Sequence, residues 1–208
     1  MPRVSQAHLD ARRRQILDAA RRCFVRNGFH ATSMQDVQAE ANLSAGAVYR
    51  YFRGKDEIIA AIAHEAVAEV AGAVESAIGA EDPPPLDEVL GAAFLAIQRV
   101  DAEQGFAKLA IQVWGESMRS PALAEVIKDE VGRVRGTLAR LVRSYQDRGL
   151  MAADPPPEQV ALVLVGLFPG FVFQHALLGD VDPAAFRTGL KALLAAPLAS
   201  PSRSPATA

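Results

Sequence analysis

The sequence predicts an all-α protein. Through most of the chain, apolar residues recur at intervals of three and four, which is the spacing of an amphipathic helix. No stretch alternates apolar and polar residues over the length of a β-strand, and no internal repeat is present. Clusters of Gly, Pro, Asn and Asp divide the helical segments from one another.

The composition is that of a globular protein with a sizeable core. Half of the 208 residues are hydrophobic, so global disorder is not expected. The single cysteine, Cys23, excludes an intramolecular disulfide and a four-cysteine zinc site. Residues 1–15 contain no apolar segment of the kind that a signal peptide needs, so we expect a cytoplasmic protein.

The two parts of the chain differ in net charge. Residues 1–64 carry ten Arg or Lys and six Asp or Glu, which gives a net charge of +4. The remaining residues carry twelve basic and eighteen acidic groups, which gives −6. This asymmetry is expected when only the N-terminal part meets a polyanion such as DNA.

The N-terminal part predicts three short helices. The first is expected over residues 8–27, where Ile16 and Phe24 share an apolar face and Asn27-Gly28 ends the helix. Ser33 and Asp36 form a capping-box pattern that begins the second helix. Asn42 suits the left-handed conformation of a tight turn.

The third helix is expected over residues 45–52, with Ser44 as its cap. Two short helices joined by a tight turn form a helix-turn-helix, which places one helix in the DNA major groove. We therefore assign residues 1–54 to a DNA-binding domain.

Residues 55–200 are expected to form a helical regulatory and dimerisation domain. A helix over residues 55–78 bridges the two domains, because the acidic, proline-rich segment 81–85 interrupts the chain after it. Further helices are expected over residues 86–100, 103–118, 121–148, 158–178 and 183–194. The tail, residues 201–208, is expected to be disordered.

The apolar run over residues 160–178 has nearly the length that spans a bilayer. Pro169-Gly170 interrupts it, His175 lies inside it, and no strongly basic flank adjoins it. These features favour a helix buried at a subunit interface over a membrane span. We therefore expect a homodimer formed through the helices over residues 158–178 and 183–194, and no membrane association.

Residues 32–59 resemble the DNA-binding signature of the TetR (tetracycline repressor) family of bacterial transcription regulators. The matching positions are Thr32-Ser33, Val37, Ala41, Leu43-Ser44, Gly46, Val48-Tyr49, Tyr51-Phe52 and Lys55-Asp56-Glu57, preceded by Phe24 and Gly28-Phe29. The resemblance implies about nine helices, a homodimer on DNA, and a ligand pocket in the C-terminal domain that controls DNA affinity. Two positions depart from the family pattern: Asn42 replaces a common turn Gly, and Ala47 replaces a common Thr.

The resemblance also implies which residues contact DNA. Phosphate contacts are expected from Thr32, Ser33 and Gln35 at the start of the second helix, and from Tyr49 and Lys55. Arg50 is the candidate for a base edge or a phosphate, since Arg can grip guanine with two hydrogen bonds. The small residues that allow close approach of the recognition helix to DNA are Ser44, Ala45, Gly46 and Ala47.

Ligand pockets between helices are mostly apolar with a few polar groups. The candidates for this pocket are aromatic, amide, thioether and imidazole side chains on the C-terminal helices: Phe94, Gln98, Gln112, Trp114, Met118, Phe168, Phe171, Gln174 and His175. Because few charges are among them, we expect a small lipophilic effector. No cofactor or metal ion is expected.

An enzyme is not expected. His64-Glu65-Ala66-Val67-Ala68 lacks the second histidine of a zinc-hydrolase helix, and Gly115-Glu116-Ser117-Met118-Arg119 lacks the second glycine of a nucleophile elbow. The expected function is a ligand-responsive transcription regulator, and release from a palindromic operator follows the family's usual mode of repression. The alternative is a helical DNA-binding or interaction module that a protein partner controls without a small ligand.

Overall fold

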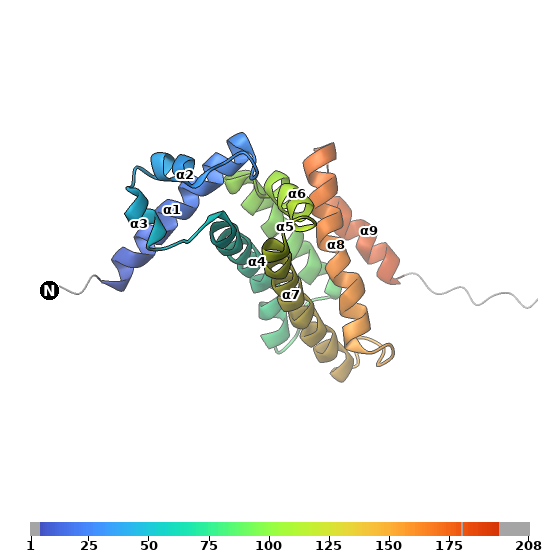
Figure 1. Cartoon of the computed structure of the whole chain (residues 1–208). Coiled ribbons are helices and arrows are strands. Elements are labelled where there is room, and N and C mark those ends of the chain that lie inside the picture. Colours follow the sequence, from blue (N-terminus) through green and yellow to red (C-terminus); the bar gives the residue numbers. More distant parts are fainter. Residues whose placement is uncertain (1–4, 180, 196–208) are drawn as a thin grey trace, which may run out of the picture.

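The computed structural model describes residues 5–179 and 181–195 and shows an all-α protein (Figure 1). Nine helices and no strand lie within these described ranges. The tail expected to be disordered, residues 201–208, lies outside them. The predicted fold class is therefore confirmed.

The head consists of α1 (Gln6–Asn27), α2 (Met34–Ala41) and α3 (Ala45–Tyr49). Ile16, Leu17 and Phe24 of α1 are fully buried and pack with Val37 of α2 and Val48 of α3. α2 and α3 have only 8 and 5 residues and cannot enclose a core with α1 alone, so the beginning of α4 and parts of α6 and α7 complete the same hydrophobic cluster.

The body consists of α4 (Lys55–Gly79), α5 (Leu86–Gln104), α6 (Phe106–Ser117), α7 (Pro121–Asp147), α8 (Pro157–Leu178) and α9 (Pro183–Ala195). α7 packs between α4 and α8, and α5 packs against α4 and α9. Figure 1 shows α8 and α9 on the side of the body that lies away from α3.

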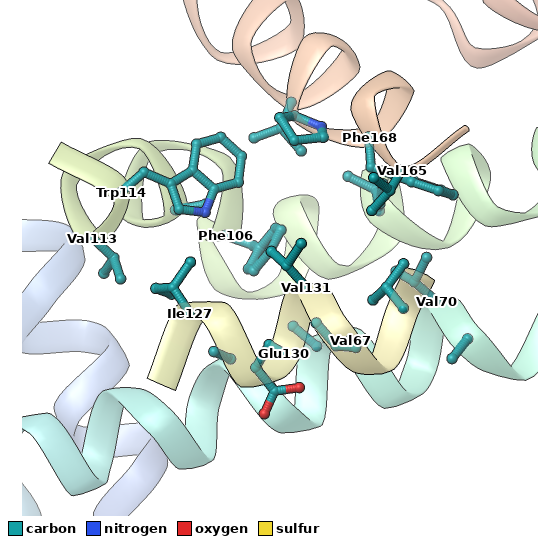
Figure 2. Close-up of a pocket in the computed structure, with 18 of the residues that line it drawn as sticks. Val67, Val70, Phe106, Val113, Trp114, Ile127, Glu130, Val131, Val165 and Phe168 are labelled. Carbon is teal, nitrogen blue, oxygen red and sulfur yellow. The ribbon is translucent and has the colours of Figure 1, made fainter. Parts of the chain in front are cut away.

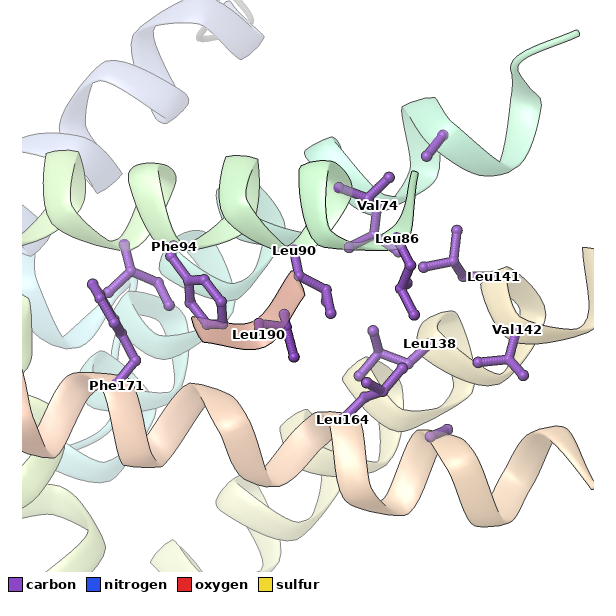
Figure 3. Packing of buried hydrophobic residues seen from close by; sticks show 14 of the residues in the cluster. Val74, Leu86, Leu90, Phe94, Leu138, Leu141, Val142, Leu164, Phe171 and Leu190 are labelled. Carbon is purple, nitrogen blue, oxygen red and sulfur yellow. The ribbon is translucent and has the colours of Figure 1, made fainter. Parts of the chain in front are cut away.

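The centre of the body is a second hydrophobic cluster (Figure 3). Leu90 and Phe94 of α5, Leu138 and Leu141 of α7, and Phe171 of α8 are almost completely buried there. Aromatic rings meet edge-on at its end, with the Phe94 and Phe186 centroids 4.7 Å apart. This cluster is the shared core around which α5, α7, α8 and α9 pack.

Three predicted helix boundaries are wrong. The helix expected over residues 86–100 continues to Gln104. The helix expected from residue 103 begins at Phe106, because Gly105 takes a left-handed conformation with φ 63° and ends α5. A Cβ on Gly105 would lie 2.8 Å from Cγ2 of Val25, so the tight approach of α1 also requires glycine here. The third helix ends at Tyr49 instead of residue 52, and a tightened turn carries Phe52 into the head cluster.

The cap predictions hold. Ser33 and Asp36 form the reciprocal capping box, with the Ser33 N–H 2.7 Å from Oδ2 of Asp36. Asn42 has φ 53° and ψ 47°, which is the left-handed turn conformation expected of it. Ser44 caps α3 and Ser120 caps α7.

Candidate DNA-binding surface and ligand cavity

The exposed edge of α2 and α3 carries most of the residues expected at DNA. Ser33 and Gln35 are exposed at the start of α2, where backbone N–H groups favour an anion. Ser44, Ala45 and Gly46 are exposed at the start of α3, and Ala47 is half-buried. A Cβ on Gly46 would meet no atom within 4 Å, so this end of α3 is open to a close approach.

Tyr49 and Arg50 extend this surface at the other end of α3. Tyr49 is 49% exposed although it is aromatic, so it does not belong to the head core. Arg50 is exposed, and it has no carboxylate partner within the described part of the chain. An unpaired Arg beside small side chains can reach a base edge or a phosphate without first breaking an ion pair.

The arginines of α1 differ from Arg50, because several are held by carboxylates. Arg22 and Arg26 bind Glu40 of α2, at 2.7 and 3.2 Å. Hydrogen bonds from these two guanidinium groups lower the pKa of Glu40 below its ordinary value. Arg13 and Arg21 bind Glu65 of α4, so these four arginines hold the head together and join it to the body.

Three residues expected at phosphate are engaged elsewhere. The Ser33 hydroxyl donates to Oδ2 of Asp36 at 2.6 Å within the capping box. Thr32 is 1% exposed, and its hydroxyl donates to the Gly28 carbonyl at 2.8 Å. Its expected phosphate contact is therefore corrected, since the side chain closes the loop after α1 instead. The ammonium of Lys55 lies 2.9 Å from the Phe29 carbonyl and 3.2 Å from the His30 carbonyl, over the Phe29 ring. Two of its three donors are thus already used in this structure.

The body contains a large apolar cavity beside α4 (Figure 2). Its interior volume is about 160 Å³, and one side opens to solvent. α4, α6, α7 and α8 form most of its wall, with side chains such as Ile62, Phe106, Trp114, Val134 and Phe168. This apolar lining is typical of small-molecule sites.

Both hydrophobic clusters contribute to the cavity wall. Ile59 and Ile62 of α4 and Leu109 and Val113 of α6 line the cavity and also belong to the cluster that supports the head. Phe168 and Val172 of α8 line it from the body cluster. A molecule in the cavity would therefore touch both parts of the protein.

Most of the chain matches two known protein families. Residues 16–62 match the bacterial regulatory proteins of the tetR family, and residues 85–199 match the C-terminal domain of BetI-type transcriptional repressors. The chain is a TetR-family transcriptional regulator.

This TetR-family regulator has relatives along almost its whole length. The transcriptional regulator UidR of Escherichia coli K12 is 25% identical over 192 residues, covering 91% of this chain and 94% of UidR. The transcriptional repressor AcnR of Corynebacterium diphtheriae is 28% identical over 188 residues, covering 88% and 90% of the two chains. The structure of Salmonella enterica GusR has a TM-score of 0.75 at 26% identity, and the match covers 93% of this chain and 99% of GusR. The similarity to TetR-family regulators thus extends beyond the head motif.

Only two of the nine expected pocket residues of this TetR-family regulator, Trp114 and Phe168, line the cavity. Phe94 and Phe171 are fully buried in the body cluster, where their rings pack 5.0 Å apart. Met118 is 86% exposed just after α6. The expectation for these core and surface residues is corrected, because helical spacing alone does not show which buried side chains border a cavity.

The four polar candidates also lie off the cavity wall. Gln98 is half-buried on α5, and Gln174 is exposed and donates to the Gly170 carbonyl. His175 lies 3.0 Å from Oδ2 of Asp101, and the other carboxylate oxygen, Oδ1, accepts the Ala107 N–H near the start of α6. Gln112 accepts a hydrogen bond from the backbone N–H of Phe29 at 2.9 Å, so it joins α6 to the head.

α4 contributes more to the cavity wall than its sequence predicted. Ala63, Val67 and Ala71 line the cavity in addition to the inward-facing Ile62 and Val70. α4 is apolar over much of its circumference, which is typical of a helix that is buried on several sides. The wide apolar circumference of α4 was therefore the feature of the sequence that could have indicated a helix with a core on one side and a cavity on another.

Proposed function

We propose that this protein is a ligand-responsive repressor that binds a palindromic operator as a homodimer and leaves it when a lipophilic effector occupies the cavity. The observation that carries the proposal is the shared wall of the cavity and the head cluster. Ile59, Ile62, Leu109 and Val113 border both, so an occupant acts directly on side chains that support α1 and α2.

The α6 helix supplies the second link between cavity and head. Trp114 and Val113 line the cavity, and the adjacent Gln112 holds the backbone of Phe29. A ligand that shifts α6 would therefore move the point at which the loop after α1 is attached. Such a ligand changes DNA affinity only if it binds the DNA-competent and incompetent arrangements differently.

The dimer is proposed to form through α8 and α9. α8 is the one described helix that is long and apolar enough to cross a membrane, and only 22% of its most apolar window is buried in the single chain. Its exposed side includes Leu162, Phe173 and Leu177, and α9 exposes Leu193. A surface of this composition is typical of an interface between subunits, which would leave the two heads free to meet successive half-sites. We propose that the protein is cytoplasmic, because its proposed target is operator DNA.

Selection of bound DNA from a random pool tests the DNA-binding surface and the dimer together. A two-fold symmetric site with two half-sites about one helical turn apart is the expected result. The selected site then serves in a release assay, in which a lipophilic compound that raises the melting temperature must also lower the operator affinity. A selected site with one half only would contradict the dimer. Stabilising compounds that leave DNA binding unchanged would favour control by a protein partner.

A further inference from the structure

The polar side chains in the cavity wall turn away from its interior. Glu130 is 5% exposed, and its carboxylate points toward Arg133 and toward His64 of α4, whose Nδ1 is 3.4 Å away (Figure 2). The Thr137 hydroxyl lies 3.3 Å from Glu75 and 3.1 Å from Arg140, outside the cavity. These hydrogen-bonding groups are therefore already satisfied and do not recognise an occupant.

Trp114 is different because its indole N–H has no acceptor within the described residues and is not among the buried unpaired groups, so it meets water. The ring lies at one end of the cavity with its nitrogen edge toward the interior (Figure 2). An indole nitrogen is a donor only. An occupant without an acceptor would remove this N–H from water and leave it unpaired, which lowers affinity.

The remaining wall excludes a charged occupant. A carboxylate or an ammonium group would lie among valine, isoleucine and phenylalanine side chains without a free counter-charge, because Glu130 is already paired. A neutral molecule avoids this desolvation cost.

The cavity is long in one direction. Ile59 and Val74 both line it, and they are fifteen residues apart on α4, which corresponds to about 22 Å along the helix axis. The opposite wall follows α7 from Ile127 to Leu138. An extended chain fills such a space better than a compact ring system.

From these four features we infer that the cavity binds a neutral, long-chain aliphatic compound with a single carbonyl group. Its carbonyl oxygen accepts the hydrogen bond from Nε1 of Trp114, and its chain lies along α4. This ligand class rests on the proposed function, in which the cavity is the effector site.

Trp114 is the only tryptophan of the chain, so its fluorescence reports directly on this end of the cavity. The full-length protein is titrated with 2-octanone, 2-decanone and 2-dodecanone, and with dodecane, laurate and dodecylamine as chain-matched controls. Each added methylene of the ketone is expected to tighten binding about fourfold. 2-Dodecanone is expected to bind more tightly than dodecane, laurate and dodecylamine.

The variant Trp114→Phe keeps an aromatic ring and removes the N–H. Isothermal titration of this variant, after its helical content is verified by circular dichroism, is expected to show about three- to tenfold weaker binding of 2-dodecanone. Its affinity for dodecane is expected to stay unchanged. An equal loss for both ligands would overturn the hydrogen bond, because it would indicate altered packing of the wall.

The outcomes separate this ligand class from the proposed function. Laurate or dodecylamine binding as tightly as the ketone would overturn the neutral ligand class, and so would the absence of binding by any ketone. Release of the operator by a compound of another class would then still support a ligand-responsive repressor. Ketone binding without operator release would support the ligand class and overturn the proposed repressor mechanism.

Discussion

Gln112 of α6 and Phe29 of the loop after α1 are joined by a hydrogen bond of 2.9 Å between the side-chain oxygen and the backbone N–H. Gly28 lies in the same contact, because a Cβ there would be 3.1 Å from the Gln112 oxygen. The bond crosses from body to head, and its glutamine stands next to two cavity-lining residues, Val113 and Trp114.

Gln112→Ala is expected to weaken the effect of a ligand on DNA binding. The loss of one hydrogen bond between the coupled elements removes about 1 kcal/mol of coupling, or roughly fivefold in the ratio of operator affinities with and without effector. Gln98→Ala is the matched control, since Gln98 is a half-buried glutamine of α5 off the cavity wall. The measurement is fluorescence anisotropy with labelled operator. An effector response equal to that of the control variant would show that the bond carries no coupling.

Arg50→Ala is expected to reduce operator affinity about ten- to hundredfold at fixed salt, since a bidentate Arg–guanine contact contributes about 1–3 kcal/mol. Arg99→Ala on α5 removes the same charge from an exposed position in the body and controls for net charge. The salt dependence of binding distinguishes a base contact from a phosphate contact, because only the latter changes the slope by about one. Equal affinities of the two variants would show that Arg50 does not contact the operator.

The sequence predicted the head better than the cavity. Caps and turns depend on neighbours in the sequence, so Ser33, Asp36 and Asn42 could be assigned correctly from their spacing. Gln112 and Lys55 were assigned to a ligand and to DNA, but their partners are backbone atoms of Phe29, which lies 83 and 26 positions away, respectively. Such contacts depend on how the helices pack, which spacing along one helix does not reveal. The same limitation explains why Phe94 and Trp114 could not be separated into core and cavity wall.

Leu177→Glu is expected to dissociate the proposed dimer. Leu177 is 61% exposed on α8, and a two-fold interface would bury it in both copies. Losing two leucine contacts of about 1.5–3 kcal/mol each raises the dimer dissociation constant by at least about a hundredfold. Leu95→Glu changes an exposed leucine of α5 and should leave the mass unchanged in sedimentation. A dimeric Leu177 variant would place the interface elsewhere.

Acid is expected to weaken the capping box of α2. Hydrogen bonds from the side chain and backbone of Ser33 lower the pKa of Asp36 below its ordinary value. Because the folded state holds the carboxylate in its charged form, the contribution is present above the pKa of the unfolded chain. It is lost as the pH falls through the lower, folded pKa. Asp36→Asn should therefore lower the melting temperature at pH 7 and make the melting temperature less sensitive to acid. Glu69→Gln changes an exposed position of α4 and should have neither effect. Parallel pH profiles for the parent and Asp36→Asn would contradict this role.

Arg187 attaches α9 to α5 through both its charge and its aliphatic stem. Its guanidinium lies 3.0 Å from the nearly buried carboxylate of Asp87 and 2.9 Å from Glu88. Its stem covers Gly91, where a Cβ would be 2.7 Å from Cδ of Arg187. The substitution Gly91→Ala therefore has two opposing effects, a gain in helix propensity and a clash with the arginine.

In an exposed helix interior, Gly→Ala stabilises by up to about 1 kcal/mol, and we expect this gain at Gly72, where a Cβ meets no atom within 4 Å. At Gly91 the displacement of Arg187 leaves Asp87 without its partner, so Gly91→Ala should destabilise by about 1–2 kcal/mol. In an Arg187→Ala background the clash is absent, and Gly91→Ala should become stabilising as at Gly72. Urea unfolding of the four variants of this cycle measures the reversal of sign. If Gly91→Ala stabilises both backgrounds equally, Arg187 does not hold α9 against α5 in the way described.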